Sequence, residues 1–247
     1  MDDPGAAVPL PGIVEVLTEL AARRDLRVAV VSGRSLEDVR TRCPVPGCWY
    51  VGGHGNETSA AAAPINGPAA GLEAAAAPAP VNNQAVRRRL GEIAAQVAAR
   101  LPQWPGVRLE AKPFSLAAHF RQAPQWEAPL RALLSRLASG GEFRLLSGRQ
   151  VIELLPAAAL TKGHAVERLR SRLNCDLAFY FGDDATDEDV FRLPDARLIG
   201  VKVASAETPG PTAAAYRVAS PGQVLSALRE IAELRQAATT GIVPGKK

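Results

Sequence analysis

Short apolar runs that end at a small or polar residue alternate with amphipathic helical patterns, and this alternation restricts the fold more than any other feature. The run from Leu26 to Val31 ends at Ser32-Gly33, and the run from Trp49 to Val51 ends in a glycine-rich loop. Such short apolar runs are typical of buried parallel strands. Apolar residues before the first run have helical spacing, namely Ile13, Val16, Leu17, Leu20 and Ala21. Helix, strand, helix, strand predicts an open α/β sheet.

The alternation is interrupted in the middle of the chain. Residues 58–80 are mostly Ala, Pro and Gly, which predicts a connector without packed structure. The next segment, 81–157, contains helical and strand patterns in a different order. We expect a helix over 86–97, strands at 107–112 and 114–121, a helix near 126–138, and strands at 142–146 and 150–155. Strands grouped around helices predict a small α+β domain inserted into the sheet domain.

The α/β pattern resumes at Lys162. We expect a helix over 163–173, a buried strand from Leu177 to Phe181, a strand near 197–203 and a final helix near 222–235. The sequence therefore predicts a core domain formed by 1–57 and 158–247, with a cap domain at 81–157.

Composition excludes several classes of protein. The chain is 47% hydrophobic and 22% charged, as in ordinary globular proteins. It lacks an apolar run long enough to cross a membrane, and the acidic start Met1-Asp2-Asp3-Pro4 differs from a signal peptide. Three cysteines are too few for a disulfide framework. We therefore expect a cytoplasmic protein that does not bind membranes.

The net charge of +4 raises the question of nucleic-acid binding. Arg87-Arg88-Arg89 is the only dense basic run, and it lies on an amphipathic helix pattern without interleaved aromatic residues. This pattern indicates a solvated helix face and no nucleic-acid partner. The basic character can still attract an anionic small molecule.

An acidic cluster follows the strand at 177–181. In Gly182-Asp183-Asp184-Ala185-Thr186-Asp187-Glu188-Asp189, five of the last seven residues are acidic, so the carboxylates repel one another unless something neutralises them. Ligands bind at the carboxyl ends of strands in open parallel sheets, and carboxylate oxygens suit Mg²⁺. The alternative is an acidic turn that favours the N-terminal dipole of the next helix.

Two further motifs indicate phosphate chemistry. Ser32-Gly33-Arg34 follows a strand, where a hydroxyl and backbone N–H groups can hold a phosphate. Lys162-Gly163 opens a helix, where a lysine can balance both a phosphate and nearby carboxylates. Each motif alone is weak, but their order around an inserted domain is specific.

These motifs resemble the trehalose-6-phosphate phosphatases of the haloacid dehalogenase superfamily. The resemblance is carried by Val31-Ser32-Gly33-Arg34, Gly53-His54-Gly55-Asn56-Glu57, Thr161-Lys162-Gly163 and the segment Gly182 to Phe191. The middle of the chain resembles the family's cap in Glu110-Ala111-Lys112, His119-Phe120-Arg121 and Val151 to Pro156. It implies a haloacid dehalogenase core and the Mg²⁺-dependent hydrolysis of trehalose 6-phosphate in trehalose biosynthesis.

The resemblance also implies roles for individual residues. Ser32 would bind the phosphoryl group, Lys162 would steady the phosphate, and Asp183 would bind Mg²⁺, with Asp184 or Asp187 completing or orienting the coordination. Substrate contacts would come from Arg34, Glu57, Lys112, His119, Arg121 and Glu153. A purely structural contact between Glu57 and the backbone is an open alternative. So is a polar strand face at His119 and Arg121 that binds no sugar.

One family motif does not occur in this sequence. The family begins with a strand ending in Asp-x-Asp-Gly-Thr, which supplies the nucleophile and the general acid/base. We expect the natural protein to start earlier, and the 247-residue chain to be inactive and to lack the first, central core strand. Two rival functions remain: a phosphatase for another sugar phosphate, such as sucrose or mannosylglycerate phosphate, or a non-catalytic module that docks on trehalose-6-phosphate synthase.

Overall fold

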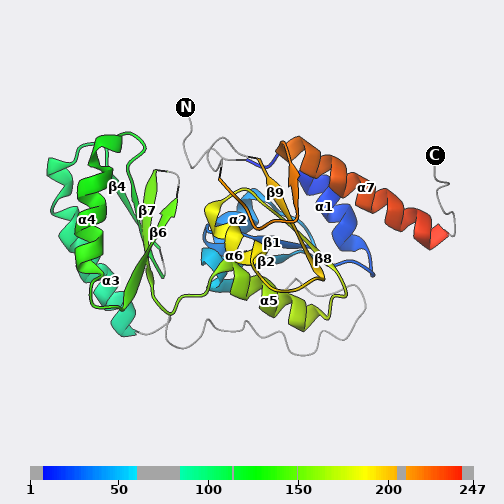
Figure 1. The fold of residues 1–247 in the computed structure, drawn as a ribbon, viewed down its shortest axis with the longest axis horizontal. Helices are drawn as coiled ribbons and strands as arrows, with labels where there is room; N and C mark the ends of the chain where they lie inside the picture. The colour runs from blue at the N-terminus through cyan, green and yellow to red at the C-terminus, as the bar shows by residue number, and fades with distance from the viewer. Residues whose placement is uncertain (1–7, 60–83, 113, 149, 205–209, 241–247) are drawn as a thin grey trace. The chain divides into compact units, whose positions relative to one another are not determined.

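The structure, a computed structural model, describes residues 8–59, 84–112, 114–148, 150–204 and 210–240 (Figure 1). The chain divides into two compact units. Met1–Ala75 and Lys162–Lys247 form the first, which we term the core unit, and Ala76–Thr161 form the second, which we term the cap unit. The predicted connector at 58–80 lies outside the described residues, except that residues 58 and 59 belong to a strand.

Within the described residues, the core unit forms two three-stranded sheets, in the orders β1-β2-β3 and β10-β9-β8. The strands are β1 (Ala29–Val31), β2 (Trp49–Gly52), β3 (Glu57–Ser59), β8 (Ala178–Gly182), β9 (Leu198–Val203) and β10 (Tyr216–Val218). β1 and β2 are parallel, as are β8, β9 and β10, whereas β3 is antiparallel to β2. The helices are α1 (Ile13–Ala22), α2 (Leu36–Arg42), α5 (Lys162–Leu173), α6 (Glu188–Phe191) and α7 (Pro221–Thr240). The predicted α/β class with a parallel sheet is confirmed.

β1 and β8 are edge strands. Each pairs with a single neighbour among the described residues, and Leu177 and Phe179 are 49% and 48% exposed. The prediction that residues 26–31 and 177–181 form buried strands is therefore wrong in its burial, because an edge strand lacks packing partners on one side. By contrast, every residue of β2, which pairs on both sides, is buried.

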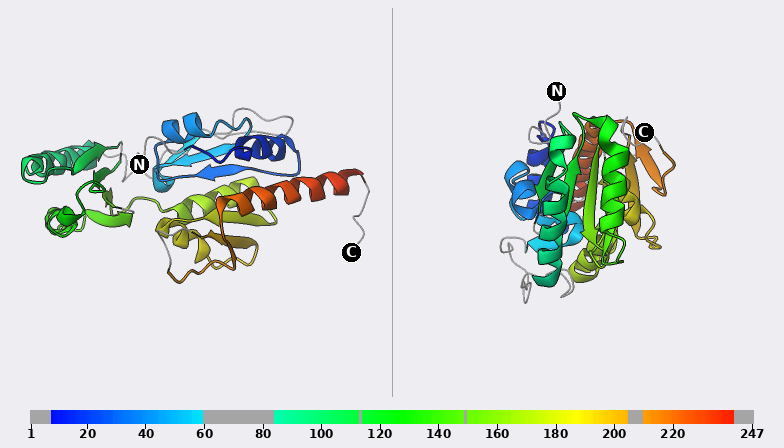
Figure 2. Two further views of the ribbon diagram at one scale, coloured as in Figure 1. Left: turned by 90° about the horizontal axis from the view of Figure 1, so that it is seen from above. Right: turned by 90° about the vertical axis from the view of Figure 1, so that its left-hand side faces the viewer.

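Helices connect the two sheets of the core unit. Leu20 of α1 and Leu225 of α7 belong to one apolar cluster. Leu169 of α5 belongs to another, together with Trp49 of β2. Figure 2 shows the blue N-terminal segment beside the yellow-to-red C-terminal segment. The two ends of the chain therefore share apolar contacts although their strands form separate sheets.

The cap unit is a four-stranded antiparallel sheet in the order β4-β5-β7-β6, with two helices on one face (Figure 1). Its elements are α3 (Gln84–Ala98), β4 (Arg108–Ala111), β5 (Leu116–His119), α4 (Glu127–Leu137), β6 (Phe143–Gly148) and β7 (Val151–Pro156). Thirteen buried residues form one continuous apolar cluster, which includes Ile93 of α3, Leu134 of α4 and Ile152 of β7. Side chains alternate between sheet faces, so the register places Glu110, Ala117 and Glu153 on the other face.

The predicted helices and strands of both units form, with ends shifted by a few residues. Two short strands, β3 and β10, were not predicted. Among the described helices, none combines the length and the apolar character needed to cross a membrane. Cys43, Cys48 and Cys175 are free thiols.

Candidate active site

The acidic loop after β8 is held in a single tight conformation. Asp184 accepts a hydrogen bond from the Thr186 N–H (3.4 Å), and its own N–H donates to Asp187 Oδ2 (2.8 Å), which completes a capping box around the 3₁₀ turn η5 (Ala185–Asp187). Gly182 lies directly beneath Asp187, because an added Cβ would stand 2.4 Å from Asp187 Cγ. The sequence Gly-Asp-Asp therefore requires glycine at its first position.

Asp187 is the centre of a buried polar network. Its Oδ1 accepts hydrogen bonds from Lys162 Nζ and from the Tyr180 hydroxyl, both at 2.7 Å. Lys162 and Asp187 are only 5% and 3% exposed, and two buried opposite charges compensate each other when both are hydrogen-bonded. This arrangement favours the orienting role that we predicted as one alternative for Asp187, because its oxygens already accept three hydrogen bonds.

Tyr180 is a member of this network that the sequence analysis missed. Burial, followed by the charge of Asp187, raises the pKa of Tyr180 well above its ordinary value. The hydroxyl therefore stays protonated and acts as a donor. Tyr180 lies two residues before Gly182, and residues two apart on a strand lie on the same face of the sheet. This spacing was a sequence signal that the Tyr180 side chain shares a face with the end of the strand.

Asp183 is the most exposed carboxylate of the loop, while Asp184 and Asp189 are partly buried. Loss of hydration, followed by the negative charges of Asp187 and Asp184, raises the pKa of Asp183 above its ordinary value. A cation beside Asp183 would relieve this repulsion. Asp183 is therefore the acid in the loop best suited to meet a positively charged ligand.

The loop matches the ligand chemistry of Mg²⁺ in kind. In the described part of the chain, no group of three or more His, Cys, Asp or Glu side chains converges on one metal position. Mg²⁺ commonly binds through one or two carboxylates and completes its shell with waters and substrate phosphate. Asp183 and Asp184 can supply such a pair, whereas the Asp187 oxygens are engaged with Lys162, Tyr180 and the Asp184 N–H.

Ser32 lies just beyond β1, at the carboxyl end of the strand. Its N–H donates to Val51 O (2.8 Å) and its carbonyl accepts from the His54 N–H (3.1 Å). Its hydroxyl oxygen accepts from the Arg34 N–H (3.1 Å). Gly33 is required here because a Cβ would stand 2.4 Å from the His54 ring. The backbone around Ser32 is thereby fixed against the loop after β2.

Arg34 and Glu57 both support helix α2. Arg34 donates to Asp38 (2.7 Å), and although burial would raise the pKa of Asp38, hydrogen bonds from Arg34 and Arg42 hold it below its ordinary value. Glu57 Oε2 accepts from the Leu36 N–H (3.0 Å) at the start of the helix. For Glu57, this contact is the backbone role that the sequence left open.

Helix α5 brings the separate loops of the core unit together. It contacts the 3₁₀ turn η2 (Gly53–Gly55), which follows β2 and bonds to Ser32, and it also contacts η5 and α6 after β8. Lys162 is the first residue of α5. The predicted residues Lys162, Asp183, Asp184 and Asp187 therefore form one cluster, and α5 links this cluster to the Ser32 loop.

In the cap unit, Glu153 is the most buried of the predicted residues. It is 6% exposed, and its Oε1 accepts from Lys112 Nζ (3.0 Å) and from the Ser115 hydroxyl (2.5 Å). His119 Nε2 lies 2.9 Å from Glu110 Oε2. Arg121 follows β5 and is half-buried. Paired charges thus occupy the sheet face opposite α3 and α4, the kind of surface that binds polyols through paired hydrogen bonds.

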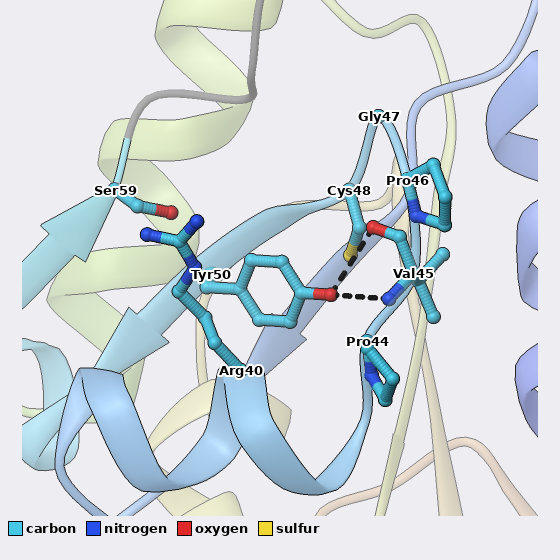
Figure 3. Close-up of a pocket in the computed structure, with 8 residues that line it drawn as sticks. All are labelled: Arg40, Pro44, Val45, Pro46, Gly47, Cys48, Tyr50 and Ser59. Atoms are coloured by element: carbon cyan, nitrogen blue, oxygen red, sulfur yellow. Dashed lines mark hydrogen bonds between the residues drawn. The ribbon is translucent and has the colours of Figure 1, made fainter.

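A hollow of about 230 Å³ lies elsewhere in the core unit. Figure 3 shows Tyr50 in it, directed at the loop before β2 and hydrogen-bonded to Val45. This loop precedes β2, so the hollow is at the amino end of the strand, away from the carboxyl ends where ligands bind. Burial raises the pKa of Cys48, which lines it, to about 12, so its thiol is not a nucleophile.

Comparison with known proteins identifies the family. The family model named Trehalose-phosphatase matches residues 1–221. The chain belongs to the trehalose-phosphatase family. It is 37% identical over 243 residues to the trehalose-phosphate phosphatase of Mycobacterium ulcerans (strain Agy99), covering 91% of this chain and 56% of that protein. The chain thus spans about half the length of the curated relatives that it matches.

Solved structures share the fold of this trehalose-phosphatase family member. The C-terminal domain of Candida albicans trehalose-6-phosphate phosphatase superposes with a TM-score of 0.73 at 20% identity, covering 95% of this chain and 88% of that chain. The C-terminal domain of the Candida albicans trehalose synthase regulatory protein gives a TM-score of 0.65 at 15% identity, covering 88% and 85%. The predicted haloacid dehalogenase-like fold is thereby confirmed.

Proposed function

We propose that this chain belongs to a Mg²⁺-dependent phosphatase that converts trehalose 6-phosphate to trehalose and phosphate. The observation that carries the proposal is the buried Lys162–Asp187 pair beside the Asp183 loop, in a member of the trehalose-phosphatase family. A buried lysine held by a carboxylate at the carboxyl end of a strand is a fixed positive charge where a phosphate can approach.

Each residue of the core unit then has a defined task. The hydroxyl of Ser32 can donate to a phosphate oxygen while its oxygen accepts from the Arg34 N–H. Lys162 neutralises phosphate charge and is held in place by Asp187. Asp183 and Asp184 would hold Mg²⁺, which when bound offsets the negative charge of the phosphoryl group.

The family route needs a carboxylate nucleophile. A carboxylate oxygen attacks phosphorus, the bond to the sugar oxygen breaks, and a general acid protonates that oxygen. Water then cleaves the aspartyl phosphate to release phosphate and restore the carboxylate. Since the sequence has no Asp-x-Asp-Gly-Thr motif, we infer that these 247 residues alone do not perform the reaction. The nucleophile would enter on a strand that pairs with β1 and β8.

A phosphate-release assay tests this proposal. The 247-residue chain should show no turnover of trehalose 6-phosphate in Mg²⁺. The same chain extended by an apolar strand ending in Asp-x-Asp-Gly-Thr should become active, and the extension with its first Asp changed to Asn serves as the folded control. Ordinary enzyme rates from the unextended chain would contradict the proposal, as would equal activity of the Asn control.

The cap unit would set the choice of sugar. Lys112, His119, Arg121 and Glu153 carry the charges that could bind sugar hydroxyls. A panel of trehalose, sucrose and mannosylglycerate phosphates, offered to the extended chain, separates trehalose 6-phosphate specificity from the alternative of another sugar phosphatase.

The missing motif also favours a second candidate, a non-catalytic module that docks on trehalose-6-phosphate synthase. The fold likeness to a trehalose synthase regulatory protein is compatible with it. Titration of purified synthase into the chain would distinguish the two candidates. Only a docking module should bind the synthase without an added strand and also lack phosphatase activity once the strand has been added. Both functions suit the cytoplasm, where thiols stay reduced.

A further inference from the structure

Lys202 is a buried lysine that the chemistry above does not use. It lies in β9, between Val201 and Val203, and is 3% exposed. Lysine is almost never fully buried without a partner, because removing its charge from water is costly. A lysine in the interior of an apolar strand therefore needs a specific reason to be there.

The partners of Lys202 are two carbonyl groups of the acidic loop. Its Nζ donates to Asp183 O (2.7 Å) and to Asp184 O (3.3 Å). The β8–β9 pairing ends where Gly182 faces Lys202, so these carbonyls lie just beyond the last pair of the ladder. The ammonium group thus supplies hydrogen bonds to the loop at the point where the neighbouring strand stops supplying them.

The loop is held from two sides as a result. The Asp184 N–H donates to Asp187 Oδ2, while the Asp183 and Asp184 carbonyls accept from Lys202. Lys202 also acts on Glu188. Burial raises the pKa of Glu188, but hydrogen bonds from Thr212 and Ala213, and then the charge of Lys202, hold it below its ordinary value.

We propose that Lys202 is a positioning residue for divalent-cation binding, which fixes the main chain of Asp183 and Asp184 so that their carboxylates are presented together. This inference rests on the proposed function, because it assigns Lys202 to the same cation site. Lys202 reaches the loop through carbonyl oxygens and makes no contact with the phosphate-binding groups Ser32 and Lys162 in the hydrogen bonds of the described residues.

Positioning and simple charge effects predict opposite results. A positive charge near a cation site repels Mg²⁺, so its removal should tighten Mg²⁺ binding if charge were its whole effect. If Lys202 positions the loop, its removal should weaken Mg²⁺ binding. The carboxylates would then have to be ordered when Mg²⁺ binds, and this ordering makes the free energy of binding less favourable. The direction of the change therefore decides between them.

Calorimetric titration of Mg²⁺ into the 247-residue chain measures that direction. Lys202→Met should weaken Mg²⁺ binding about tenfold, the size typical of one lost charge-assisted hydrogen bond, and Lys202→Arg should restore most of it. Arg197→Met is the matched control, since it removes one positive charge just before β9 from a side chain that is 67% exposed. Unchanged or tighter binding in Lys202→Met would overturn the inference.

Hydrogen exchange of the loop gives a readout that does not depend on metal. Without Mg²⁺, amides 184–187 should exchange faster in Lys202→Met than in the wild type, while amides of β2 and the cap unit keep their rates. Unchanged loop exchange, or faster exchange throughout the core unit, would leave Lys202 a merely structural residue. Absence of Mg²⁺ binding in the wild type would instead count against the proposed function, and the exchange result would still decide the role of Lys202.

Discussion

The cap unit and the core unit differ in how their sheets are completed. Among the described residues, the cap has one four-stranded sheet, a cluster of thirteen buried apolar residues between this sheet and two helices, and a small second cluster around Leu155 and Ala159. The described part of the core unit has two separate sheets and three apolar clusters, each much smaller than the large cap cluster. Ile152 in the cap sheet is fully buried, whereas Phe179 in β8 is 48% exposed. Apolar packing therefore explains the cap more fully than it explains the core.

Polar interactions replace part of that packing in the core unit. Lys162, Asp187 and Lys202 are all nearly inaccessible, and all lie at the carboxyl ends of β8 and β9 or beside them. Buried charges contribute little net stability compared with apolar packing, but breaking one pair is costly. The core thus combines open strand edges with a buried charge network, an arrangement that is common at functional sites.

The largest predicted effect breaks that network. Lys162→Met leaves Asp187 buried without its cation, so the free energy of unfolding of the core unit should fall by about 3–5 kcal/mol. The cap unit should be unaffected because its cluster shares no residue with this pair. Urea unfolding followed by hydrogen exchange, which reports the two units separately, measures both values.

Lys112→Met is the matched control in the cap unit. Lys112 pairs with Glu153 at 3.0 Å, but its side chain is 18% exposed, compared with 6% for Lys162. Water screens the more exposed pair, so its loss should cost less than the loss of Lys162. The double variant Lys162→Met/Asp187→Asn should recover part of the stability. Equal losses in both single variants would show that the core does not depend on its buried charges more than the cap does.

The sequence predicted the elements and the strand-end residues because those depend on local pattern. Ser32 follows an apolar run, Asp183 follows another, and Lys162 opens a helical pattern, so each was placed from its neighbours alone. The network around Asp187 was only partly accessible. That Asp187 would face Lys162 rather than a cation depends on how α5 packs against η5, which no local spacing specifies.

Three features depended on distant pairing and were missed or mispredicted. Lys202 was missed, because its carbonyl partners follow from the β8–β9 register. β3 forms only because Glu57–Ser59 fold back on β2. The exposure of Phe179 follows from the lack of a second neighbour for β8 among the described residues, whereas an apolar run by itself indicates burial.

An intermediate effect should separate the tasks of the two units. In the extended, active chain, Glu153→Gln should lower kcat/KM for trehalose 6-phosphate tenfold to a hundredfold, since a hydrogen bond to a charged group is worth about 1.5–3 kcal/mol. For p-nitrophenyl phosphate, which has no sugar, kcat/KM should stay within about twofold of the wild-type value. A tenfold change would correspond to about 1.4 kcal/mol. Steady-state kinetics on both substrates checks this.

Glu127→Gln controls for a general effect of charge removal in the cap. Glu127 lies in α4, where its half-exposed side chain pairs with Arg131. Both substrates should react at wild-type rates in this variant. If Glu153→Gln lowered kcat/KM equally for both substrates, Glu153 would not take part in sugar recognition. Its hydrogen bonds with Lys112 and Ser115 would then serve only to stabilise the fold of the cap.

The smallest predicted effect concerns the open edge itself. In the 247-residue chain, Phe179→Ala should cost less than about 1 kcal/mol of core stability, because a half-exposed side chain on an edge strand loses few contacts. Ile152→Ala, its matched change in the covered sheet, should cost about 2–5 kcal/mol in the cap.

If an added strand pairs with β1 and β8, it covers Phe179, and the cost of Phe179→Ala should rise toward about 3–5 kcal/mol in the extended chain. Denaturant unfolding of the two parent chains and the three variants measures these values. A cost for Phe179→Ala that is small in both chains would mean that the added strand does not pack against β8, and the nucleophile would then have to reach the site by another route.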